Sequence, residues 1–196
     1  MVGNTQDRRI QKTRAALHEA LISLMRERPY ESIMVKNILD RANVGRSTFY
    51  MHYRDKDELL IEGLQHLQAH LQQAQDETRL TAKNNCDRVI GFSLAMFEHA
   101  HEHQDVYKTL VGGQAWVVIG GHMEEMLVQI IKKEAKPIFK KGGQADVPFE
   151  LFTHTVGSAF WAVMTWWLDQ EAPLPPTRIN AIFRDLIIPT LASKLV

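Results

Sequence analysis

Almost every segment of this 196-residue chain carries apolar residues at helical spacing, and this periodicity is the strongest constraint on its fold. The stripe Leu60, Leu64, Leu67 and Leu71 is one example, with leucines three or four residues apart. No stretch shows sustained alternation of apolar and polar residues with a strand-rich composition. The sequence therefore predicts an all-α protein of about nine helices.

Glycine and proline residues mark the breaks between the predicted helices. Pro29 ends the first helix, and Pro189 should kink the last one, because proline has no amide hydrogen to donate. After the first, helices are predicted near residues 35–42, 46–53, 55 onward, 86–103, 105–111, 115–136, 149–170 and 177–193.

Two short helices flank the turn Asn43-Val44-Gly45, in which Asn43 or Gly45 can adopt a positive φ. Two short helices separated by such a turn form a helix-turn-helix, whose second helix enters the major groove of DNA. The organisation we expect is a three-helix helix-turn-helix domain over residues 1–54, followed by a helical domain over residues 55–196.

The predicted helix 46–53 has little apolar surface, which is unusual for a helix that serves only as packing. Phe49 and Tyr53 lie four residues apart and anchor one side of it. Its other side chains are polar, namely Arg46, Ser47, Thr48, Tyr50 and His52. Arginine can pair with guanine, and threonine can meet a base edge or a thymine methyl group. Tyr50 as a core aromatic, and His52 as a merely solvated residue, remain as alternatives.

The charge distribution supports a polyanionic partner at the N-terminal end. Residues 1–56 hold eleven Lys and Arg against six Asp and Glu, a net charge of +5. Because the whole chain is neutral, the other 140 residues carry −5. Lys56 follows Asp55, which can cap the free amides of the long helix while Glu58 reaches back to the Asp55 amide. Lys56 is placed, with Tyr50 and His52, to hold DNA phosphates.

The run from Val44 to Leu60 closely resembles the DNA-binding domain of TetR-family regulators, and the likeness extends over residues 13–64. The Thr-Phe-Tyr-x-His-Tyr core, the Lys after it and the Leu-Leu pair have family spacing. Met34 stands where the family usually has a capping Ser or Thr, so that cap is either missing or supplied by Ser32. The resemblance implies a repressor released from its operator by a small ligand, with DNA contacts at Lys36, Arg46, Ser47, Thr48, Tyr50, His52 and Lys56.

The remainder of such proteins forms a ligand and dimerisation domain. The last two predicted helices have a wide apolar girth, which a two-fold interface would bury, so we expect a homodimer through residues 149–193. Aromatic and Met side chains suit an adaptable apolar cavity, and the candidates for ligand contact are Phe97, Tyr107, Trp116, Phe160 and Met164. Ordinary core packing is the alternative for each.

Other functional classes find less support. There is no Gly-rich phosphate loop, nucleophile elbow or HExxH motif, so we expect no enzyme and no cofactor; an all-α adaptor is the other rival. His99 and His103 lie one helical turn apart, but no set of metal ligands is evident, and we expect no metal. A single Cys, a polar N-terminus and the lack of a membrane-spanning apolar run lead us to expect a cytoplasmic protein.

Overall fold

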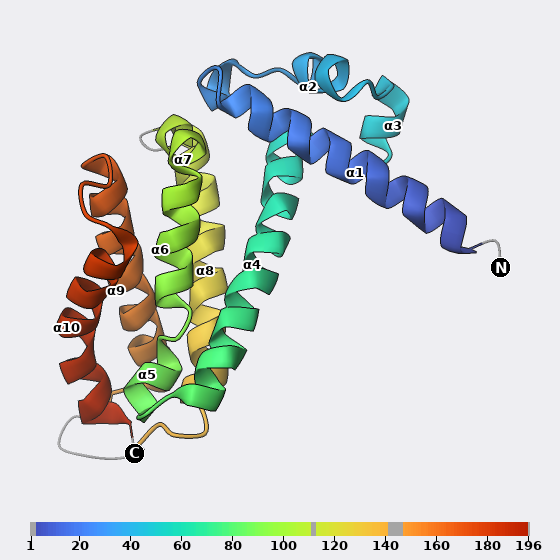
Figure 1. Ribbon diagram of the computed structural model, residues 1–196. Coiled ribbons are helices and arrows are strands. Elements are labelled where there is room, and N and C mark those ends of the chain that lie inside the picture. Colours follow the sequence, from blue (N-terminus) through green and yellow to red (C-terminus); the bar gives the residue numbers. More distant parts are fainter. Residues whose placement is uncertain (1–2, 111–112, 141–146, 196) are drawn as a thin grey trace. The chain divides into compact units, whose positions relative to one another are not determined.

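A computed structural model describes residues 3–110, 113–140 and 147–195 (Figure 1). The regular secondary structure of these residues is helical, which confirms the all-α prediction. Phe139 and Leu195 add one isolated antiparallel bridge. The described residues form α1 (Gly3–Met25), a short 3-10 turn η1 (Tyr30–Ser32), α2 (Val35–Ala42), α3 (Arg46–Tyr50), α4 (Lys56–Thr81), α5 (Asn85–Val89), α6 (Ser93–Glu102), α7 (Gln104–Leu110), α8 (Gln114–Ala135), α9 (Phe149–Asp169) and α10 (Pro176–Lys194).

The single helix predicted over residues 86–103 is two helices, α5 and α6, which was the main error in the helix prediction. The helix is interrupted around Gly91, where an added Cβ would lie 2.6 Å from Cβ of Thr78 on α4. The buried side chain of Gln75, also on α4, accepts a hydrogen bond from the Phe92 amide at 2.9 Å and donates one to the Arg88 carbonyl. A buried side chain from another helix therefore satisfies the backbone groups that the break releases.

Contacts divide the chain into two compact units. The first contains residues 1–66 and 105–119, and the second contains residues 67–104 and 120–196. The functional boundary expected between residues 54 and 55 stays a prediction, because contacts group residues by packing and not by role. None of the helices in the described part of the chain has the length and apolarity needed to cross a bilayer.

In the first unit, α1 packs on α2, and α2 packs on α3. Leu17, Leu21 and Leu24 of α1 are fully or almost fully buried, which gives this helix the apolar stripe that its sequence predicts. At its end, Arg41 of α2 holds both carboxylate oxygens of Glu27 at 2.8 Å. A bidentate pair of this kind defines orientation as well as distance, so it helps to set α2 against α1.

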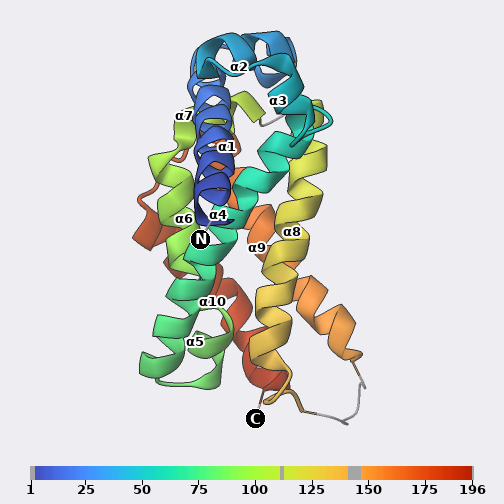
Figure 2. The same ribbon diagram turned by 90° about the vertical axis from the view of Figure 1, so that its right-hand side faces the viewer.

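In the second unit, α6, the part of α8 from Gly120 onward, α9 and α10 run roughly alongside one another in Figure 1, and Figure 2 shows that α9 and α10 are inclined to α8. Their core is a cluster of buried aromatic rings. Phe160 of α9 lies at its centre, with ring centroids 4.9 Å from Phe97, 5.0 Å from Phe183 and 5.3 Å from Phe92. Trp167 extends the cluster, 5.5 Å from Phe97. Edge-on and tilted ring pairs at these distances contribute beyond the area that they bury, so this cluster helps to stabilise the unit.

Candidate nucleic-acid interface

The turn between α2 and α3 takes its shape from Asn43. This residue has φ 52° and ψ 46°, the left-handed conformation that asparagine tolerates better than most residues. Its amide and that of Val44 both donate to the Leu39 carbonyl, which ends α2. Gly45 has a negative φ, so of the two residues predicted to reverse the chain it is Asn43 that does so.

The helix α3 has one buried side and one open side. Phe49 and Tyr53 are buried, which confirms the expectation that they anchor it. Arg46, Ser47 and Tyr50 are exposed, while Thr48 and His52 are half-buried. Since residues four apart share a helix face, Arg46 and Tyr50 line the open side together.

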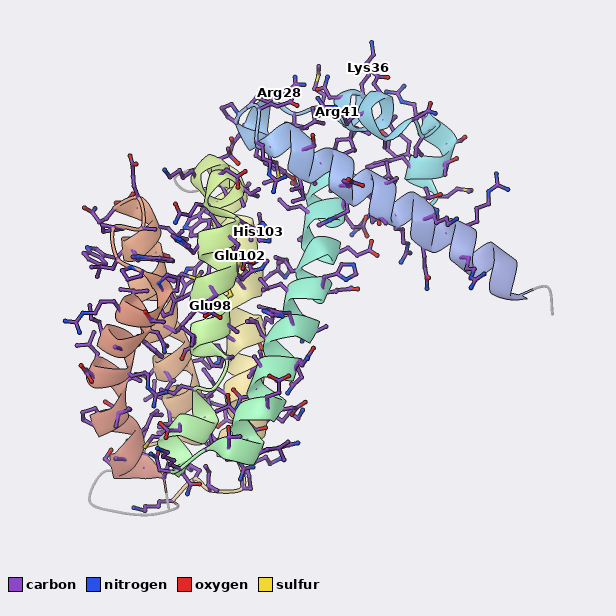
Figure 3. The ribbon with its side chains drawn as sticks, in the orientation of Figure 1. Arg28, Lys36, Arg41, Glu98, Glu102 and His103 are labelled. Atoms are coloured by element: carbon purple, nitrogen blue, oxygen red, sulfur yellow. The ribbon has the colours of Figure 1, made fainter. Side chains whose placement is uncertain are left out.

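The cations of the helix-turn-helix and the end of α1 are of two kinds. Lys36 extends outward from α2, with Arg28 and Arg41 on the same module (Figure 3). Within the described residues, Arg28, Lys36 and Arg46 form no ion pair, whereas Arg41 is held by Glu27 and Ser23. Lys36 and Arg46 are both exposed, so they place positive charge on α2 and at the start of α3, and such charge suits a phosphate backbone.

The start of α2 lacks the hydroxyl that a cap usually supplies. Met34 occupies the N-cap position, is 63% exposed, and has no side-chain oxygen to offer the free amides. Ser32 does not replace it, because among the described residues its hydroxyl donates to the Pro29 carbonyl at 2.7 Å and accepts from no amide of α2. Half of a capping arrangement remains, in which Asn37 Oδ1 accepts from the Met34 amide at 2.9 Å.

Lys56 is more deeply engaged than its sequence position suggests. Its ammonium donates to the Tyr30 carbonyl at 2.7 Å and to the Ile33 carbonyl at 2.8 Å, and lies 4.2 Å from the centre of the Tyr30 ring. Burial lowers the pKa of this ammonium. Because an ammonium has three N–H donors, one is left for a phosphate after these two bonds. The phosphate contact expected at Lys56 stays a prediction. Lys56 also holds the Tyr30 and Ile33 carbonyls, a structural role that sequence reasoning missed.

The residue that the sequence analysis overlooked is Tyr30, the partner of Lys56. It is almost fully buried, and its hydroxyl donates to Asp57 Oδ1 at 2.5 Å. Burial raises the pKa of this hydroxyl, and the bond to Asp57 raises it further. Tyr30 follows Pro29 within the stretch that resembles the family, which was the available signal, although nothing in the spacing points to Lys56 and Asp57.

The start of α4 follows its predicted capping closely. Asp55 Oδ1 accepts from the Glu58 amide at 2.8 Å, as expected for an N-cap residue. The Glu58 carboxylate reaches back to the Arg54 amide at 2.7 Å, one residue before the predicted one. This first turn supplies Lys56 and Asp57, so its capping also positions the contacts to Tyr30.

The five residues expected to contact a ligand fall into both units. Phe97, Phe160 and Met164 are fully buried in the second unit, where the first two belong to the aromatic cluster. Tyr107 and Trp116 lie in the first unit with ring centroids 6.5 Å apart, and burial raises the pKa of Tyr107. The structure therefore places four of the five inside packed cores, and the ligand site stays a prediction.

The histidines of α6 do lie close together. The rings of His99 and His103 are 4.5 Å apart. Burial lowers the pKa of His99 to about 4, and the neighbouring His103 and His70 add to this effect. Among the residues described, no group of three or more His, Cys, Asp or Glu side chains is arranged to hold a metal ion.

Together, these features define a helix-turn-helix protein of the DNA-binding class. Two family models match the chain: that of the bacterial regulatory proteins of the TetR family over residues 17–62, and that of a transcriptional regulator C-terminal region, also of TetR type, over residues 87–189. The second alone covers more than half of the chain. The protein therefore belongs to the TetR family of transcriptional regulators.

Individual relatives agree with this assignment. The uncharacterized helix-turn-helix regulator YxbF of Bacillus subtilis is 19% identical over 180 residues, which are 88% of this chain but 44% of the relative. A TetR regulator from Streptococcus agalactiae is 26% identical and matches with a TM-score of 0.64, covering 93% of this chain and 97% of its own. The Thermus thermophilus repressor FadR, solved with lauroyl-CoA, is 15% identical with a TM-score of 0.63, covering 89% and 93%.

Replacing Met34 by Thr should restore the missing cap. A threonine oxygen can accept from a free amide of α2, so we expect the free energy of unfolding to rise by about 1 kcal/mol. Urea denaturation of Met34→Thr, with Met34→Ala as the control that supplies no oxygen, measures the difference. Equal stabilities of the two variants would show that α2 gains nothing from a capping oxygen.

Proposed function

We propose that this regulator is a repressor that binds a near-palindromic operator as a homodimer and leaves it when a small ligand binds. The observation that carries the proposal is the open side of α3, where Arg46, Ser47 and Tyr50 are exposed while Phe49 anchors the helix. A five-residue helix is too short to be stable in isolation, so its polar face is held in place by the module around it. Such a rigid polar face is suited to reading base edges.

The proposed DNA contacts divide by chemistry. Arg46 and Thr48 are proposed to meet base edges, and Ser47 lies beside them on the same helix. Phosphates are assigned to Lys36, Tyr50, His52 and Lys56. A DNA partner also implies a cytoplasmic location, which we propose on that ground.

The two kinds of contact should separate on mutation. Arg46→Ala should relax base preference and weaken binding to the best site by about 1–3 kcal/mol, the value of a good bidentate contact. Lys36→Ala should weaken binding to all DNA sequences equally, because one phosphate contact is lost. The slope of log affinity against log salt concentration should fall by about one. Lys36 is a better choice for this test than Lys56, because Lys36 forms no hydrogen bond or ion pair within the described residues.

Gel shifts on an operator selected from random duplexes, and on unrelated DNA, measure both effects across a salt series. Arg178→Ala is the matched control, because it removes an exposed cation of α10, and we expect no change. Identical sequence selectivity of the Arg46 and Lys36 variants would contradict the division of these contacts into base and phosphate contacts. An intact protein that binds no duplex at low salt would instead support the adaptor alternative.

The homodimer rests on apolar side chains that α9 and α10 leave uncovered. Leu151 and Trp166 on α9 and Leu186 on α10 are each more than half exposed. Large exposed apolar groups on two adjoining helices favour an interface, and a two-fold contact would cover both copies at once. A symmetric dimer would also present two copies of α3 to the two halves of a palindrome.

A charge placed on this surface should split the dimer. Leu186→Glu would bury a carboxylate without a partner, so we expect the variant to be monomeric at micromolar concentration. Light scattering measures the mass, and Leu80→Glu is the matched control, because Leu80 on α4 is 85% exposed but lies outside α9 and α10. A wild-type monomer, or equal behaviour of both variants, would contradict the proposed interface.

A small-molecule ligand with an apolar portion is proposed as the signal. Support comes from the aromatic and Met-rich composition of the second unit and from the similar fold of FadR, which was solved with lauroyl-CoA. The five candidate residues remain Phe97, Tyr107, Trp116, Phe160 and Met164. Because four of these side chains are buried, a ligand that reaches them has to displace existing packing.

Ligand and operator should weaken each other equally. With lauroyl-CoA as the first probe, a 100-fold loss of ligand affinity in the presence of operator corresponds to a coupling of about 2.7 kcal/mol, and the operator must lose the same factor. Calorimetry with and without operator measures both affinities. A probe that binds equally well in the two titrations is not the inducer, and a panel of acyl and aromatic probes that all behave so would contradict ligand control.

A further inference from the structure

Met51 is the most exposed large apolar residue of the helix-turn-helix. It follows directly after α3 and remains helical, with φ −74° and ψ −20°. Its amide donates to the Ser47 carbonyl at 3.1 Å, so its side chain lies one turn beyond Ser47 on the same face. That face is turned away from buried Phe49, and Met51 is 74% exposed there.

Exposed groups that suit DNA lie on the same helix as Met51 and on the helix before it. Arg46 and Ser47 share the open side of α3, and the exposed cation Lys36 stands on the preceding helix. The positive charges complement a phosphate backbone, but a thioether cannot donate to a phosphate and is only a weak acceptor for a polar base edge. The apolar group that the major groove offers is the C5-methyl of thymine.

We propose that Met51 determines sequence specificity by contacting a thymine methyl group in each half-site. This inference rests on the proposed DNA binding by α3. Methionine suits the contact because its unbranched, polarizable side chain adapts to an irregular surface. The contact adds a wholly apolar side chain to a recognition surface whose other proposed contact residues all carry polar groups.

Deoxyuridine provides a direct test, because it differs from thymidine only by the missing methyl group. An operator is first selected from random duplexes with wild-type protein, and each thymine is then replaced by deoxyuridine in turn. One position in each half-site should lower wild-type affinity about fourfold, the effect of one buried methyl, and replacing both should lower it about fifteenfold.

Variants of Met51 identify the partner of that methyl group. Met51→Gln keeps the length of the side chain but not its apolar character, so thymine and deoxyuridine should bind it equally well at the sensitive positions. Met51→Leu should retain the discrimination, and so should Arg178→Ala, which removes an exposed cation of α10 outside the helix-turn-helix. Circular dichroism checks that each variant is folded.

The outcomes separate this inference from the function on which it rests. If Met51→Gln still discriminates thymine from deoxyuridine, the proposed role of Met51 is wrong. Selected half-sites that contain no thymine would also overturn it. Neither result would contradict DNA binding by α3. Wild-type protein that selects no duplex at all would overturn the DNA-binding proposal and this inference with it.

Discussion

Three contacts converge on Tyr30, and the orientation of the helix-turn-helix depends on them. Its hydroxyl donates to Asp57, its carbonyl accepts from Lys56, and its ring lies beneath the same ammonium. Lys56 reaches the Ile33 carbonyl as well, one residue before the N-cap of α2. The first turn of α4 therefore holds the segment that leads into α2 in place through hydrogen bonds. Removing either charged partner would leave polar groups half-buried and unpaired, which is costly.

The open face of α3 follows from this arrangement. The helix contributes five residues and a single fully buried side chain, Phe49, so its own interactions cannot hold it in place. It is held instead by the Asn43 turn on one side and by Tyr53 and the capped start of α4 on the other. A surface that reads DNA has to be rigid before it binds, and here the rigidity comes from residues that do not themselves face the groove.

Local signals in the sequence predicted most of what is local in the structure. The Asn43 turn, the cap at Asp55 and the buried pair Phe49 and Tyr53 all follow from residue type and spacing. What escaped prediction depends on contacts between distant parts of the chain. The break at Gly91 needs Gln75 from another helix, and the carbonyls that hold Lys56 lie more than twenty residues before it. The roles of the proposed DNA contacts depend on a second molecule, which no pattern in this chain describes.

The central claim, that α3 reads the major groove, can be tested by methylation interference on a selected operator. Dimethyl sulfate modifies guanine N7 in the major groove and adenine N3 in the minor groove, so it labels the two grooves separately. If α3 of each subunit enters the major groove, DNA methylated at guanine N7 within two half-sites about one helical turn apart should be missing from the bound fraction. Interference confined to adenine N3, or none at either groove, would contradict the account.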